Sequence, residues 1–82
     1  MKWGIKILPR DVLLDTQGRA VQDYLNQPNQ TASQLVNQVR VGKYIVLDLK
    51  QSDKEVSKKK AIEITEQTLI NPLIETYTIE AL

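Results

Sequence analysis

The strongest constraint in this sequence is the alternation of apolar and polar residues between positions 39 and 49. Apolar residues take every second position on both sides of Gly42-Lys43, namely Val39, Val41, Ile45, Leu47 and Leu49. A period of two residues is typical of a β-strand with one buried face. We therefore predict strands over residues 35–41 and 43–50, joined by a tight hairpin in which Gly42 supplies the necessary freedom in φ.

The second predicted strand also carries apolar residues on its other face, Tyr44 and Val46. A sheet with apolar residues on both faces usually has both faces covered. The chain has 82 residues, and we predict a single domain over residues 1–82. Because so short a chain builds only a small core, association would add to its stability. The hairpin therefore suggests a protein partner.

Similar patterns predict the other elements. Residues 1–8 alternate and should form the first strand, with Trp3 in the core and Pro9 ending it. A connector over residues 10–15 leads to a helix over residues 17–25 capped by Asp15, followed by a polar loop at 26–30. Ser52-Asp53 opens a helix that continues to about residue 69, and Ser52 can cap it at capping-box spacing from Glu55. Asn71-Pro72 stops that helix, and residues 73–80 form the last strand.

This order predicts an α+β, ferredoxin-related β-α-β-β-α-β fold. Right-handed crossovers would give a four-stranded antiparallel sheet with two helices on one face. The other face would stay open, and an open apolar face usually marks an interface. We expect a homodimer or larger assembly through sheets or edges, with these residues in the homodimer interface: Tyr44, Val46, Leu8 and Ile74.

The composition argues against chemistry carried by this chain alone. It contains no cysteine and no histidine, so thiolate metal sites and the commonest general base are missing. The net charge of +1 does not suggest nucleic-acid binding. No signal peptide and no apolar run of roughly 20 residues is present. We therefore expect no catalytic residue, no metal site, no membrane or nucleic-acid partner and a cytoplasmic location.

Two short stretches carry the best candidate binding residues. Asp15 to Arg19 could hold an anion at a helix start or simply form a capped turn. Arg40 and Lys43, at the tip of the predicted hairpin, could meet a phosphate or an acidic protein surface, or could remain solvated. The pattern alone leaves both alternatives open for each stretch.

Three segments together resemble the PurS family, the small subunits of bacterial phosphoribosylformylglycinamidine synthase. They are Asp15-Thr16-Gln17-Gly18-Arg19-Ala20-Val21, Val39-Arg40-Val41-Gly42-Lys43-Tyr44-Ile45 and Asn71-Pro72-Leu73-Ile74-Glu75-Thr76-Tyr77. Their order and separations fit the family over nearly the whole chain. Thr16 departs from the pattern, because the family commonly has proline there.

The resemblance implies a subunit of a glutamine-dependent, ATP-consuming C–N ligase in purine biosynthesis. This chain would be non-catalytic and would bind no cofactor, while the partner subunits use ATP, Mg and glutamine. It would form a dimer, possibly a tetramer, and bridge the synthetase large subunit and the glutaminase subunit so that ammonia passes between them. The residues matched to the family motif would form the partner interface: Arg40, Gly42, Lys43, Tyr44, Asp15, Gln17, Gly18 and Arg19.

Other classes of function fit the residues less well. A small-molecule-sensing regulatory module could bind a metabolite at its dimer interface, since a fold does not fix a function. A single-strand nucleic-acid binder would need several aromatic residues on the open face, where only Tyr44 is expected. An enzyme acting alone would need a nucleophile, a base and an orienting group, and no such set is present.

Overall fold

The computed structural model describes residues 1–11 and 15–82. The predicted connector over residues 10–15 therefore lies partly outside the described residues. The elements are β1 (Lys2–Pro9), α1 (Thr16–Leu25), β2 (Lys43–Asp48), α2 (Lys54–Ile64), the π-helix η1 (Thr65–Leu69) and β3 (Glu75–Ala81). They belong to two compact units. We call Met1–Arg10 with Gly42–Leu82 the sheet unit and Asp11–Val41 the helix unit, and we describe each by itself.

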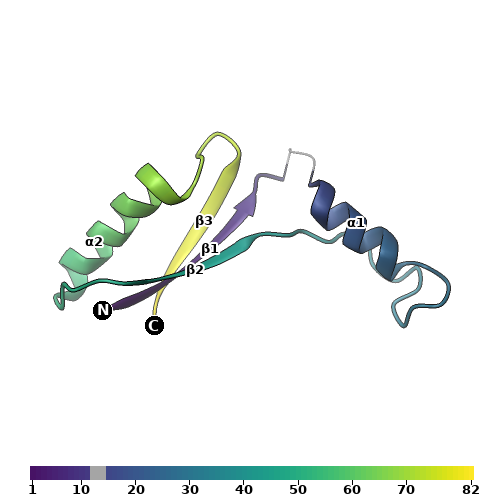
Figure 1. The fold of residues 1–82 in the computed structure, drawn as a ribbon, viewed down its shortest axis with the longest axis horizontal. Helices are drawn as coiled ribbons and strands as arrows, with labels where there is room; N and C mark the ends of the chain where they lie inside the picture. Colours follow the sequence, from purple (N-terminus) through teal and green to yellow (C-terminus); the bar gives the residue numbers. More distant parts are fainter. Residues whose placement is uncertain (12–14) are drawn as a thin grey trace. The chain divides into compact units, whose positions relative to one another are not determined.

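The sheet unit is built on a three-stranded antiparallel sheet in the order β2-β1-β3 (Figure 1). The central strand β1 places Ile5 opposite Ile45 of β2 and opposite Ile79 of β3. The α+β class is confirmed, but the described residues form three strands instead of the four expected. β2 pairs with β1, so the predicted pairing of residues 43–50 with residues 35–41 is wrong.

One face of this sheet packs against α2, which runs alongside it in Figure 1. Trp3, Ile5 and Ile7 of β1 are buried together with Ala61 of α2, which confirms Trp3 as a core residue. Burying an apolar side chain of this size contributes about 1.5–3 kcal/mol. The indole Nε1–H of Trp3 donates to Oγ of the buried Ser57 at 2.8 Å. The only indole donor in this small core is therefore satisfied.

The second helix differs from the prediction in its capping residue and in the type of its last turn. Asp53, and not Ser52, is the N-cap, and its Oδ1 accepts from the Val56 N–H at 3.0 Å. The α-helix ends at Ile64, and the five residues of η1 continue as a π-helix. Pro72 follows in the connector to β3, and β3 starts at Glu75 instead of Leu73. The predicted stop at Asn71-Pro72 and the predicted helix end at residue 69 are thus confirmed, although the last five helical residues are π-helical.

The helix unit contains α1 and the segment that follows it. Asp15 caps α1 as predicted, and its Oδ1 accepts from the Gly18 N–H at 2.9 Å. Asn26 is the C-cap residue. A series of turns then covers residues 26–35, within which Gln34 has a positive φ of 59°. The helix predicted over residues 17–25 is confirmed with one more residue at its start.

The predicted strand over residues 35–41 forms no strand in the described structure, and the two cap residues of α1 hydrogen-bond to backbone groups near both of its ends. The Asn26 amide donates to the Val36 carbonyl at 2.9 Å and accepts from the Val36 N–H at 3.1 Å. At the other end of α1, Asp15 Oδ2 accepts from the Val41 N–H at 2.8 Å. Alternation alone could not reveal these hydrogen bonds, since they come from cap residues distant in the sequence.

Gly42 has a different role from the one predicted. No described glycine has a positive φ, so Gly42 does not form the tight reversal of a hairpin. A Cβ at this position would collide with the Ile7 carbonyl and would lie 2.6 Å from Leu8 Cδ2. Gly42 therefore allows the start of β2 to lie close against β1.

Candidate functional site

Asp15 links the start of α1 to the segment that ends the helix unit. One carboxylate oxygen caps the helix at Gly18 and the other holds the Val41 N–H. The hydrogen bond from Gly18, followed by that from Val41 and by the nearby Arg40 guanidinium, holds the pKa of the Asp15 carboxyl below its ordinary value of 3.8. Asp15 is thus ionised at neutral pH and stabilises the contact between these two segments.

Gly18 allows the same contact at a second point. It is buried, and a Cβ there would collide with the Val39 carbonyl and would lie 2.6 Å from the Asp15 carboxylate. Only a residue without a side chain lets residues 39–41 lie this close to α1. Arg40 pairs with Asp11 at 3.0 Å within the same unit.

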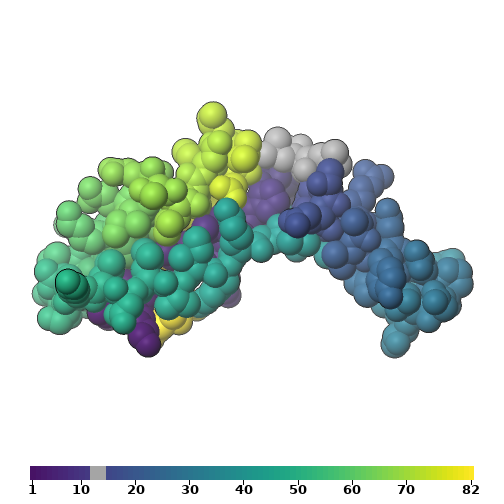
Figure 2. Space-filling model, viewed as in Figure 1, coloured from purple at the N-terminus to yellow at the C-terminus, as the bar shows by residue number. Residues whose placement is uncertain are grey.

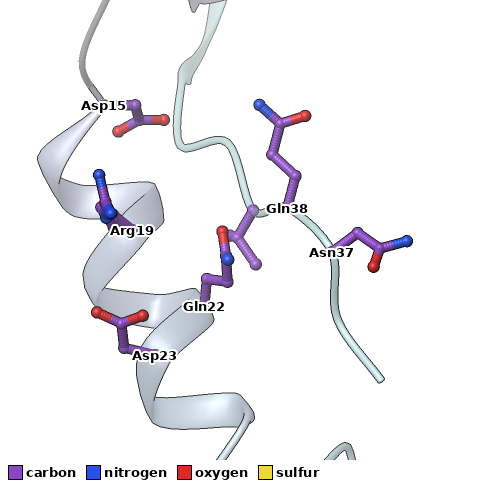
Figure 3. Close-up of a pocket in the computed structure, with 7 residues that line it drawn as sticks. Asp15, Arg19, Gln22, Asp23, Asn37 and Gln38 are labelled. Carbon is purple, nitrogen blue, oxygen red and sulfur yellow. The ribbon is translucent and has the colours of Figure 1, made fainter. Parts of the chain in front are cut away.

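A polar hollow of about 480 Å³ lies between α1 and residues 37–39. Figure 3 shows Asp15, Arg19 and Asp23 one below another along α1, with Arg19 between the two carboxylates. Asn37 and Gln38 belong to the facing segment. Gln17 and Arg19 are exposed on the first turns of the helix. The hollow offers amides and charges suited to contact with a polar protein surface.

The remaining predicted partner residues lie in the sheet unit, and two of them face opposite ways. Lys43 stands opposite Ile7, on the face that α2 covers, and pairs with Glu75 at 3.6 Å. Tyr44 stands opposite Lys6, on the open face. Its hydroxyl donates to Glu80 Oε1 at 2.8 Å. This hydrogen bond crosses β1 at Gly4, where a Cβ would collide with the Tyr44 hydroxyl. This hydrogen bond raises the pKa of the Tyr44 phenol.

Three of the four residues predicted for a homodimer interface share the open face of the sheet. They are Tyr44, Val46 and Leu8, and a hollow of about 330 Å³ lined in part by Lys6, Leu8 and Tyr44 lies among them. Ile74 is exposed in the turn before β3 and belongs to no strand. The sequence predicted a strand start at Leu73, which would have placed Ile74 in the sheet, but β3 starts at Glu75.

Sequence reasoning missed the polar residues that β3 adds to the open face. Thr78 and Glu80 stand opposite Lys6 and Gly4 on the other side of β1 from Tyr44 and Val46. Alternation along the last strand contained this information, but the strand was interpreted only through its apolar positions. The open face therefore combines a few apolar side chains with a larger number of polar ones.

Comparison with known proteins places this arrangement in one family. The model of the family described as PurS, phosphoribosylformylglycinamidine (FGAM) synthase, matches residues 2–82. The chain belongs to the PurS family. The phosphoribosylformylglycinamidine synthase subunit PurS of Synechocystis sp. is 37% identical over 76 residues, which cover 93% of this chain and 73% of that protein.

Solved PurS structures resemble the whole chain. A chain in the structure of PurLQS from Thermotoga maritima has a TM-score of 0.86 at 26% identity, covering 99% of this chain and 95% of that one. PurS of B. subtilis has a TM-score of 0.75 at 34% identity, covering 96% and 94%. The prediction of a PurS-family chain is thus confirmed, and PurS is a subunit of FGAM synthase, a ligase complex that uses ATP and glutamine.

Two further observations concern the described ranges 1–11 and 15–82 only. None of their helices is long and apolar enough to cross a membrane. Within these ranges, no three carboxylate, histidine or cysteine side chains lie together in a way that could hold a metal ion.

Proposed function

We propose that this chain is the non-catalytic small subunit of FGAM synthase and that it bridges the synthetase and glutaminase subunits. The match to the PurS family over residues 2–82 carries the proposal. The likeness to a chain of PurLQS supports it, because that structure comes from a multi-subunit assembly. The partner subunits would use ATP, Mg and glutamine, and the bridge would let ammonia pass between them. We propose a cytoplasmic location for the complex, because enzymes of purine biosynthesis act in the cytoplasm.

A second copy of the chain is the proposed cover for the open sheet face. Val46 is 52% exposed and Tyr44 is 49% exposed, and both lie on the open face of the sheet, where Leu8 lines a hollow together with Tyr44. Packing two such faces together would bury apolar area worth about 25 cal/mol per Å². The dimer could associate further into a tetramer through sheet edges.

The helix unit is the proposed contact for a different subunit. Four of the motif residues, Asp15, Gly18, Arg40 and Gly42, make close contacts within the chain. Their proposed role at the partner interface is to shape it. Gln17 and Arg19 are exposed beside the polar hollow and are the side chains proposed to touch the partner, together with Lys43 and Tyr44 of the sheet unit.

Reconstitution of the complex with its two partner subunits tests this role. Arg19→Glu should lower glutamine-dependent activity roughly ten-fold, because a reversed charge opposes a complementary partner surface. Ammonia-dependent activity should stay unchanged, since it bypasses the glutaminase. Lys59→Glu, on the exposed side of α2, is the matched control. Equal glutamine-dependent activity of Arg19→Glu and the control would refute the contact.

Co-purification tests the wider function. Tagged chain from its own cells, with nucleotide and glutamine present, should retain a large ATP-dependent synthetase and a glutaminase-type amidotransferase. Recovery of the chain without either protein would contradict the proposed subunit role.

A further inference from the structure

The sheet unit contains a second hollow that the bridging role does not use. It measures about 370 Å³ and lies where η1, the connector to β3 and the start of β3 meet. Figure 2 shows this yellow-green part of the chain at the surface. Arg10, Glu66 and Tyr77 supply polar groups, and Ile70 and Pro72 supply apolar ones. Apolar atoms provide most of its lining.

Arg10 is held at one side of the hollow by the backbone. Its Nε and Nη2 both donate to the Pro72 carbonyl, at 3.1 and 2.6 Å. Its main-chain N–H donates to the Ile74 carbonyl at 2.9 Å. These bonds fix the guanidinium and leave Nη1 to serve as a donor. A guanidinium fixed in this way is ready to bind a carboxylate.

Glu66 is held at the hollow by Tyr77. The Tyr77 hydroxyl donates to Glu66 Oε1 at 2.7 Å. Partial burial, with the Glu66 hydrogen bond adding to it, raises the pKa of the Tyr77 phenol, which therefore stays a donor at neutral pH. The Tyr77 hydroxyl thus orients the Glu66 carboxylate through Oε1. Its other oxygen, Oε2, can accept a hydrogen bond from a cation.

The opposite charges in this hollow do not neutralise each other. None of the ion pairs within residues 1–11 and 15–82 joins Arg10 to Glu66. The third charged group, Glu75, is occupied by Lys43 and by the Asn71 N–H. A ligand that carries both charges and an apolar part offers a partner to each of these side chains and to Ile70 and Pro72.

The backbone beside the hollow is also irregular. In η1 the Ile70 N–H donates to the Thr65 carbonyl at 3.1 Å, the five-residue spacing of a π-helix. Glu66 lies within this wider turn and Ile70 directly follows it, and both line the hollow. π-helical turns are rare and occur frequently at functional sites.

We propose that this hollow binds a free α-amino acid with an apolar side chain. The ligand carboxylate pairs with Arg10, its ammonium pairs with Glu66 Oε2, and its side chain lies on Ile70 and Pro72. The site lies within the sheet unit of one copy and does not depend on the proposed bridging role. Its location also differs from a metabolite site at a dimer interface.

Titration of the full-length chain with L-leucine, followed by ¹H–¹⁵N NMR, tests the site. We expect saturable shifts at Arg10 and over residues 66–77. Isopentylamine, which lacks the carboxylate, and 4-methylpentanoate, which lacks the ammonium, should each bind at least about ten-fold more weakly. Absence of a localised saturable shift, or analogue binding as tight as that of leucine, would overturn the proposal.

Two variants separate a binding role from a folding role. Arg10 and Glu66 are exposed, so Arg10→Gln and Glu66→Gln should fold and keep the far-UV circular dichroism of the parent chain. Each should weaken leucine binding about ten-fold or more. Lys59→Gln on α2 is the control and should bind leucine normally. Parent-like affinity in both Arg10→Gln and Glu66→Gln would refute the assigned contacts.

Discussion

At the scale of single residues, the motif at the start of α1 holds the helix unit together. Asp15 accepts hydrogen bonds from Gly18 and Val41, and Gly18 lets Val39 pass against the helix. These residues were singled out for partner binding, yet each also has a clear intramolecular role. Any substitution there therefore needs a measurement of stability beside one of binding.

Gly18→Ala should destabilise the helix unit by about 1–3 kcal/mol, because its Cβ would overlap the Val39 carbonyl and force a backbone shift. Urea denaturation followed by circular dichroism measures the loss. Gln17→Ala, at an exposed neighbouring position, should change stability by no more than about 0.5 kcal/mol. Equal midpoints for the two variants would contradict the close approach.

Asp15 should make the helix unit sensitive to acid. Its folded pKa lies below the ordinary 3.8, so the stabilisation is fully present above that value. It is lost as the pH falls through the lower folded pKa. The protection factors of the Gly18 and Val41 amides against hydrogen exchange, measured by NMR and corrected for the intrinsic pH dependence, should fall below about pH 4. In Asp15→Asn this acid dependence should be absent, and its persistence would assign the effect to another carboxylate.

At the scale of elements, the sequence predicted the extent of both helices but not the π-helical turns of the second or its Asp53 N-cap. Period-two alternation identified β1 and β2, and helical spacing with a cap identified α1. Ser57 and Ala61 of α2 and Thr65 of η1 are buried on both sides of the change from α-helix to π-helix. Local pattern does not contain that packing.

Asp53→Ala should lower stability by about 1 kcal/mol, because the first turn of α2 loses the acceptor for the Val56 N–H. Ser52→Ala should have almost no effect, although Ser52 has the capping-box spacing. Thermal denaturation of both variants under identical conditions compares them. A larger loss for Ser52→Ala would show that the capping box forms in solution.

At the scale of the whole molecule, association should depend on the open face of the sheet. Val46→Lys places a charge beside Tyr44 on this face and should convert the assembly to monomers in sedimentation-velocity experiments. Val56→Lys is a close control, since Val56 is 44% exposed on α2 and Val46 is 52% exposed on β2. Dissociation by Val56→Lys alone would place the interface on the helix.

The sequence by itself determined the α+β class, the core strand with Trp3, the Asp15 cap and, through three motifs, membership of the PurS family. Each depends on neighbouring residues or on short segments in a fixed order. Only the tertiary structure decided that residues 35–41 form no strand and that Gly42 allows a close approach. The physical reason is that backbone hydrogen bonds go to whichever partner the fold brings near. Here the side chains of Asp15 and Asn26 supply those partners from both ends of one helix.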